Sequence, residues 1–305
     1  MKLFAHILTG AALALTSCNQ WPQQPPPRPM FGPGSASQPY GAVTAPAYPS
    51  QPQPPAPPPA NWSNGATTPP ASSWQRPGAA RSQSLGHGAT LYDVSAGGTD
   101  IQVVVFDSRQ CVLRVIDQPS PNAGGGVISQ AMPYHRAIAG VNGGFFHPDF
   151  QPLGLLLASG RKHGQFTHNK LLSGSVLVVS NEPYLVWNSE FLGEQGVSDL
   201  IQSGPRLVDR GRPIDSLDRA KLAPRTFIAN DGKRIWAIGV ARNASLAGLA
   251  ELLARPGFVA GLQIERALNL DGGRSSAFWA RTAAGREISQ PGWSTVRNYL
   301  AVVPR

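Results

Sequence analysis

Two segments of the chain place a polar side chain directly before a pair of glycines. Asp271 follows the largely apolar run 267–270 and precedes Gly272 and Gly273, and Asn142 precedes a second Gly-Gly pair. Glycine lets the backbone approach a ligand closely, and loops that follow strands often carry function. A carboxylate in such a loop can act as a base or as a nucleophile. The alternative is that each Gly-Gly pair only marks a turn.

Two further segments carry groups that can bind an anion. One is Arg225-Thr226, where the arginine opens an expected strand, and the other contains Ser203 and Gly204. A guanidinium holds phosphate through two parallel hydrogen bonds, which a lysine cannot copy. A surface ion pair is the alternative for Arg225, and a plain Gly-Pro turn is the alternative for Ser203 and Gly204.

The elements that position these loops are mostly β-strands. Apolar runs bounded by Gly, Pro, Asn or Asp predict strands at 101–106, 111–116, 137–141, 154–158, 175–179, 184–187, 226–229, 235–241, 267–270, 275–279 and 299–303. Helical periodicity is limited to 245–254, with Ser245 as the N-cap, and to a shorter stretch at 127–132. Many strands with about two helices predict a single β-rich α+β domain with a mixed sheet.

Together and in this order, the segments resemble the phosphodiester glycosidase family, the bacterial relatives of the uncovering enzyme. The resemblance covers about residues 135–305 and includes 291–298 near the end of the chain. It implies a hydrolase that cleaves the anomeric C–O bond of a sugar-1-phosphodiester. The leaving group is then a phosphate monoester, which needs little protonation because its second pKa is about 6. One carboxylate near the anomeric carbon can therefore replace the usual glycosidase pair.

The resemblance implies catalytic roles for three residues. Asp271 acts at the anomeric carbon, Arg225 holds the phosphate, and Asn142 offers a donor and an acceptor to sugar hydroxyls or an acetamido group. Substrate-binding positions are implied at Gly143, Gly144, Ser203, Gly204, Gly272, Gly273, Arg274, Ser275, Ser276 and His147. Amides and hydroxyls of 272–276 can form an anion nest. The family commonly has a small residue where Arg274 stands, which leaves the substrate identity in question.

Each role has a structural alternative. Asp271 can cap its own turn, Asn142 can be a turn asparagine, and His147 can be an exposed loop histidine. Glu265 and Glu251 are alternative carboxylates, although no glycine flanks either one.

The sequence assigns no metal or cofactor. His163 and His168 have no carboxylate partner at ligand spacing, so whether a divalent cation takes part stays open. Cys111 lies in an apolar run, which indicates a small buried side chain rather than a nucleophile.

The first residues carry an export signal. Lys2 precedes the apolar run 3–15, which is too short to span a bilayer. The run ends in Leu-Thr-Ser-Cys, which resembles a bacterial lipobox and predicts a lipoprotein signal peptide at 1–17 with lipidation at Cys18. An ordinary secretory signal is the alternative. Because Asn rather than Asp occupies position 19, we expect anchoring in the bacterial cell envelope, at the outer membrane facing the periplasm.

Residues 18–84 predict a disordered tether. Of the 30 prolines, 18 fall within 19–84, which contains no Asp or Glu and cannot bury enough apolar surface to fold. The predicted domain is therefore 85–305, where 22 Lys and Arg face 17 Asp and Glu. No basic run or zinc-finger spacing is present, so nucleic acid is not expected as a partner. The mild positive charge suits a sugar phosphodiester or a phosphorylated glycan.

Three function classes remain. One is the envelope hydrolase, and the second is a non-catalytic envelope lipoprotein that binds a wall glycan or phosphopolymer in the same cleft. The third cleaves the P–O bond and would normally use a metal cluster, which the sequence does not indicate.

Overall fold

The computed structural model describes residues 81–305 except 119, 121–126 and 260–261. The expected signal peptide, Cys18 and the tether up to residue 80 lie outside the described residues. Strand β1 (Arg81–Gly86) begins four residues before the expected domain boundary. It pairs antiparallel with β2 (Ala89–Ala96) and buries Leu85. No proline occurs between 78 and 118, so the backbone there is free to donate to a sheet.

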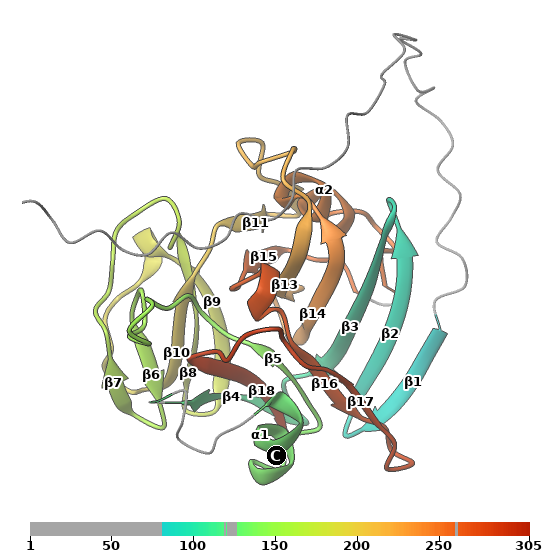
Figure 1. The fold of residues 1–305 in the computed structure, drawn as a ribbon, viewed down its shortest axis with the longest axis horizontal. Helices are drawn as coiled ribbons and strands as arrows, with labels where there is room; N and C mark the ends of the chain where they lie inside the picture. The colour runs from blue at the N-terminus through green and yellow to red at the C-terminus, as the bar shows by residue number, and fades with distance from the viewer. Residues whose placement is uncertain (1–80, 119, 121–126, 260–261) are drawn as a thin grey trace, which may run out of the picture. The chain divides into compact units, whose positions relative to one another are not determined.

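The described strands form three sheets (Figure 1). The eight-stranded sheet joins β1 and β2 to β3 (Thr99–Asp107), β14 (Ile235–Ala244), β13 (Ala223–Asn230), β15 (Arg266–Asn269), β11 (Arg206–Asp209) and β12 (Arg212–Pro213), in that order. One five-stranded sheet has the order β7 (Arg161–His163), β6 (Leu156–Ala158), β10 (Val197–Ser203), β8 (Gly174–Val179) and β9 (Glu182–Trp187). The other has the order β17 (Glu287–Gln290), β16 (Phe278–Arg281), β5 (Ala139–Asn142), β18 (Asn298–Pro304) and β4 (Cys111–Asp117).

All three sheets contribute to one central core. Phe106 of β3, Leu113 of β4, Val176 of β8 and Phe278 of β16 belong to the same buried cluster. Alternate residues of the strands that line it face this core, because successive side chains point to opposite sides of a sheet. Burial of large apolar side chains from three sheets therefore fixes how the loops at the strand ends are placed.

Two helices cover outer faces of these sheets. Helix α1 (Ile128–Tyr134) packs Met132 on β5 at Gly140, where a Cβ atom would lie 2.1 Å from the methionine sulfur. Helix α2 (Leu246–Leu253) packs beside β11, β12 and β14. Its N-cap is Ser245, whose hydroxyl accepts a hydrogen bond from the Gly248 amide at 3.0 Å. Within the described residues, no helix is long and apolar enough to cross a membrane.

The α+β class, the single β-rich domain and the two helices are confirmed. The expected mixed sheet is not found, because every strand pair among the described residues is antiparallel. The chain joins its strands without the helical crossovers that parallel neighbours require. Strand β16 also begins later than expected, because Gly273–Ser275 form the 3₁₀ helix η2.

Candidate active site

The loop after β15 is fastened to the end of β5. The backbone amide of Asp271 donates to the Gly143 carbonyl at 2.9 Å, and the Asn142 side-chain amide donates to the Asp271 carbonyl at 2.7 Å. β15 belongs to the eight-stranded sheet and β5 to a different one. These two bonds therefore join two sheets at the position of the candidate carboxylate.

Asn142 is enclosed by protein. Its side chain has no exposed surface, and its Oδ1 accepts from the Thr226 hydroxyl at 2.7 Å and from the Ala277 amide at 3.0 Å. The Ser276 hydroxyl lies 3.2 Å from that of Thr226. Asn142 therefore uses its donor and its acceptor inside the protein, which fits a positioning role better than the expected contact with sugar hydroxyls.

Asp271 is largely buried, and its carboxylate has two hydrogen-bond donors. Oδ1 accepts from the Gly272 amide at 2.8 Å, and the Ser275 hydroxyl also donates to the carboxylate. Burial raises the pKa of Asp271 above its usual value of 3.8, and the two hydrogen bonds only partly offset this effect. A poorly solvated carboxylate with a raised pKa is a better proton acceptor than an ordinary aspartate, as a base or a nucleophile requires.

The two positions after Asp271 require glycine for different physical reasons. A Cβ atom on Gly272 would lie 2.9 Å from the Pro224 carbonyl oxygen and 3.8 Å from Cδ of Arg225, so only glycine permits this close approach. Gly273 has φ of +62°, in the left-handed region that glycine adopts without strain. Together they bring the Asp271 loop against the start of β13.

Arg225 therefore lies next to the Asp271 loop. Its Nε donates to the Ala244 carbonyl at 3.1 Å and its Nη2 to the Lys221 carbonyl at 2.8 Å. Burial lowers the pKa of the Arg225 guanidinium, with Asp218 acting in the opposite direction. Two backbone carbonyls thus fix the orientation of this cation.

The other expected glycine positions are buried. A Cβ atom on Gly143 would lie 1.8 Å from Oδ1 of Asn298, and one on Gly144 would lie 2.8 Å from Ile201. The Gly204 carbonyl accepts from the side-chain amide of Asn269 at 2.8 Å. These glycines serve close packing.

The Ser203 hydroxyl is a buried polar group without a hydrogen-bond partner among the described residues. Oδ1 of Asn269 shares this property. Both residues flank the Gly204 carbonyl to which Asn269 donates, so this corner of the site retains unused hydrogen-bonding capacity.

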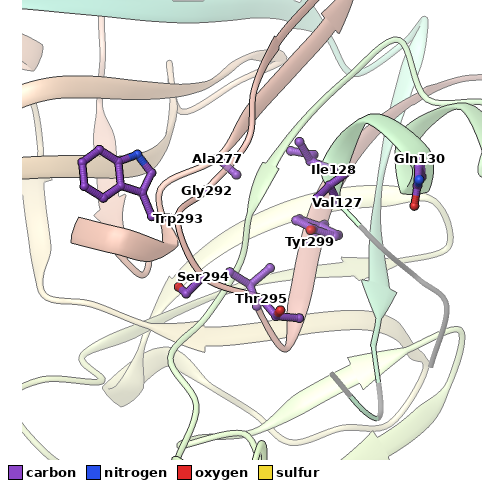
Figure 2. A pocket seen from close by; sticks show the side chains of 10 residues that line it. Val127, Ile128, Gln130, Ala277, Gly292, Trp293, Ser294, Thr295 and Tyr299 are labelled. Carbon is purple, nitrogen blue, oxygen red and sulfur yellow. The ribbon is translucent and has the colours of Figure 1, made fainter. Parts of the chain in front are cut away.

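A cavity of about 720 Å³ opens beside the Asp271 loop. Gly273, Arg274 and Ser276 of that loop line it, together with Pro224, which directly precedes Arg225. A second cavity of about 380 Å³ lies next to it and is drawn in Figure 2. Gly292 and Trp293 line both cavities, so the segment that carries them separates the two.

The remaining candidates lie apart from this loop or take no visible part in it. His147 is exposed in a turn, and its side chain makes no hydrogen bond to any other candidate in the part of the chain that is described. Glu251 forms an ion pair with Arg219 at 2.7 Å. Cys111 is buried, as expected, and burial raises the pKa of its thiol to about 11.

No group of three or more His, Cys, Asp or Glu side chains suitable for a metal occurs in the described ranges. His163 nevertheless has a carboxylate neighbour, since its Nε2 lies 3.4 Å from Asp117. Arg297 also pairs with Asp117, at 2.8 Å. Sequence spacing missed this cluster because its members come from three separate strands or strand ends.

Sequence reasoning also missed Thr226 as a support for Asn142, although it lies in the segment that was singled out. The sequence feature that could have indicated its role is a polar threonine directly after a candidate arginine, at the start of an apolar strand. Trp293 stands out in the sequence only as part of the segment 291–298. Arg242 also lines the larger cavity, and it gives no sequence signal because it is a single charge at the end of an apolar strand.

Comparison with known proteins bears on this arrangement. A family model described as phosphodiester glycosidase matches residues 135–303, more than half of the chain. No curated protein sequence gives a significant match.

Several solved structures are similar in fold. One is the zebrafish N-acetylglucosamine-1-phosphodiester alpha-N-acetylglucosaminidase catalytic domain, auto-inhibited by its pro-peptide. It is 14% identical, with 74% of this chain and 88% of that chain covered and a TM-score of 0.52. Another is a hypothetical protein from Synechocystis, at 16% identity, 74% and 64% coverage and a TM-score of 0.49.

Proposed function

The chain belongs to the phosphodiester glycosidase family, and on this basis we propose that it hydrolyses the anomeric C–O bond of a sugar-1-phosphodiester. The observation that carries the proposal is the setting of Asp271. The residue is partly buried, its carboxylate has a raised pKa, and its backbone is hydrogen-bonded to the end of a strand from another sheet. The zebrafish enzyme of similar fold acts on such a phosphodiester, as its name states.

In this proposal, the bond from the anomeric carbon to the bridging oxygen breaks, and water supplies the oxygen that finally replaces it on that carbon. The phosphate monoester leaves with the bridging oxygen, and the sugar gains a hydroxyl from water. Arg225 and Arg274 stabilise the negative charge of the departing phosphate, since preorganised cations act most strongly where charge develops. Asn142 and Thr226 hold the Asp271 backbone and do not contact the substrate.

Asp271 has two possible roles, which predict different products. As a base it deprotonates the attacking water and the sugar inverts its configuration. As a nucleophile it forms a covalent glycosyl intermediate and the configuration is retained. Proton NMR of the first-formed sugar anomer distinguishes these roles.

Hydrolysis of sugar-1-phosphodiesters in ¹⁸O-labelled water tests the proposal. Label in the sugar supports C–O cleavage, and label in the phosphate contradicts it in favour of P–O cleavage. Binding of the substrates without turnover contradicts the proposed hydrolase activity and supports a non-catalytic glycan-binding lipoprotein.

We also propose that the protein is anchored in the bacterial envelope by a lipid on Cys18, on the evidence of the N-terminal sequence alone. Cys18→Ser is expected to abolish processing or to release the protein from membranes. A processed variant that still fractionates with membranes contradicts the lipid anchor.

A further inference from the structure

The cavity beside the Asp271 loop carries positive charge and no acidic side chain. Of the described residues that line it, Arg242 and Arg274 are charged, and both are exposed. Neither forms an ion pair with a described carboxylate. Arginine binds phosphate through a planar fork of N–H donors, so two such groups facing one cavity favour a phosphorylated ligand.

Trp293 adds an aromatic surface to the same cavity. It is 84% exposed, which is unusual for the largest apolar side chain. Its backbone is nevertheless held, because the Trp293 amide donates to the Arg274 carbonyl at 2.7 Å. Figure 2 shows the indole pointing away from Ile128 and Tyr299, which line the smaller cavity. The side chain is therefore a solvent-facing ring on a held backbone rather than part of the core.

An exposed indole beside a phosphate site fits a ligand with two parts. The C–H face of a carbohydrate or another cyclic polyol packs on an aromatic face, while its hydroxyls stay with water and with polar groups such as Ser276 and Ser289. The volume of about 720 Å³ lies within the range of ligand sites. A linear polyol phosphate would use the arginines and leave the indole uncovered.

We propose that this cavity receives the leaving-group side of the substrate and that Arg242 and Trp293 determine specificity there. Arg242 joins Arg225 and Arg274 in binding the phosphate, and Trp293 stacks on a polyol ring attached beyond it. This assignment rests on the proposed function, because the leaving group is defined by cleavage next to Asp271. It makes the enzyme selective for phosphodiesters that join a sugar to a second ring.

Equilibrium binding by calorimetry tests the cavity without any turnover. The probes are myo-inositol 1-phosphate, glycerol 3-phosphate and myo-inositol, which have no anomeric centre and so undergo no turnover during the measurement. The full chain is expected to bind myo-inositol 1-phosphate most tightly and unphosphorylated myo-inositol most weakly.

The variants separate the two contacts. Trp293→Ala is expected to weaken myo-inositol 1-phosphate binding by about 2- to 12-fold and to leave glycerol 3-phosphate unchanged. Arg242→Gln is expected to weaken the binding of both phosphorylated probes by about tenfold or more. Arg161→Gln, an exposed arginine on β7, is the matched control and is expected to change neither.

Equal effects of Trp293→Ala on both phosphates, or no effect on either, overturn the assignment, as does an Arg242→Gln variant that binds like the control. The proposed function fails separately: a protein that shows the expected binding pattern but cleaves no phosphodiester keeps the cavity assignment and loses the hydrolase. A protein that hydrolyses substrate without this pattern loses the cavity assignment alone.

Discussion

The side-chain amide of Asn142 donates a hydrogen bond to the backbone carbonyl of Asp271, 2.7 Å away, across 129 positions of sequence. Its Oδ1 is held in turn by the Thr226 hydroxyl. The position of the candidate carboxylate therefore depends on a buried polar network in which every bond has a geometric role. Such networks are costly to break, because leaving a buried acceptor without its donor lowers the stability of the folded protein by about 1–3 kcal/mol.

Replacement of Thr226 tests this network. Thr226→Val keeps the shape and removes the hydroxyl, so we expect a loss of about 1–2 kcal/mol in unfolding free energy and a lower kcat with little change in KM. Thr226→Ser keeps the hydroxyl and is the matched control. Denaturant unfolding and steady-state kinetics measure both, and equal behaviour of the two variants would contradict the positioning role.

Arg225→Lys tests the cation next to the Asp271 loop. A lysine keeps the charge but cannot bond to the Ala244 and Lys221 carbonyls together in the geometry that the guanidinium uses. We expect a higher KM for the phosphodiester and a lower melting temperature. Kinetics that match the wild type would remove Arg225 from phosphate binding.

The raised pKa of Asp271 predicts how stability depends on pH. Between its usual value of 3.8 and the higher folded value, the folded protein binds more protons than the unfolded chain, so this group makes stability fall as pH rises through that window. Asp271→Asn removes the ionisation. We expect the variant to melt at a higher temperature than the wild type at pH 7, with the difference absent at pH 3. If the melting temperature of Asp271→Asn relative to that of the wild type is lower at pH 7 than at pH 3, the burial argument is contradicted.

The sequence predicted the fold class because strand runs and the Ser245 cap are local signals. It predicted that Gly272 lets the backbone approach a ligand closely, whereas the close approach in the structure is to the Pro224 carbonyl, which is distant in sequence. It could not show that Asn142 is fully enclosed, since burial of a polar side chain depends on which strands become neighbours. The strands β2 and β10 were missed because polar residues interrupt their apolar pattern. The short strand β7 and the 3₁₀ helix η2 were missed because their apolar pattern is too brief to be informative.

The start of the domain gives a fourth prediction. A chain that begins at residue 81 retains β1 and is expected to fold and to keep the full-length kcat on a soluble substrate. A chain that begins at residue 87 lacks β1, including the buried Leu85, and exposes the edge of β2. We expect it to be less stable by a few kcal/mol. Thermal unfolding that does not distinguish the two chains would contradict the assignment of β1 to the folded unit.

The central claim is that Asp271 acts directly in hydrolysis. Its most direct test is the kcat of Asp271→Asn on a sugar-1-phosphodiester, compared with Glu265→Gln, which makes the same carboxylate-to-amide change at the next candidate acid. We expect kcat to fall by about 10²–10⁴-fold for Asp271→Asn, with KM nearly unchanged, and to stay at the wild-type level for Glu265→Gln. A folded Asp271→Asn variant that turns over substrate within about threefold of the wild type, against that range, would remove Asp271 from the mechanism.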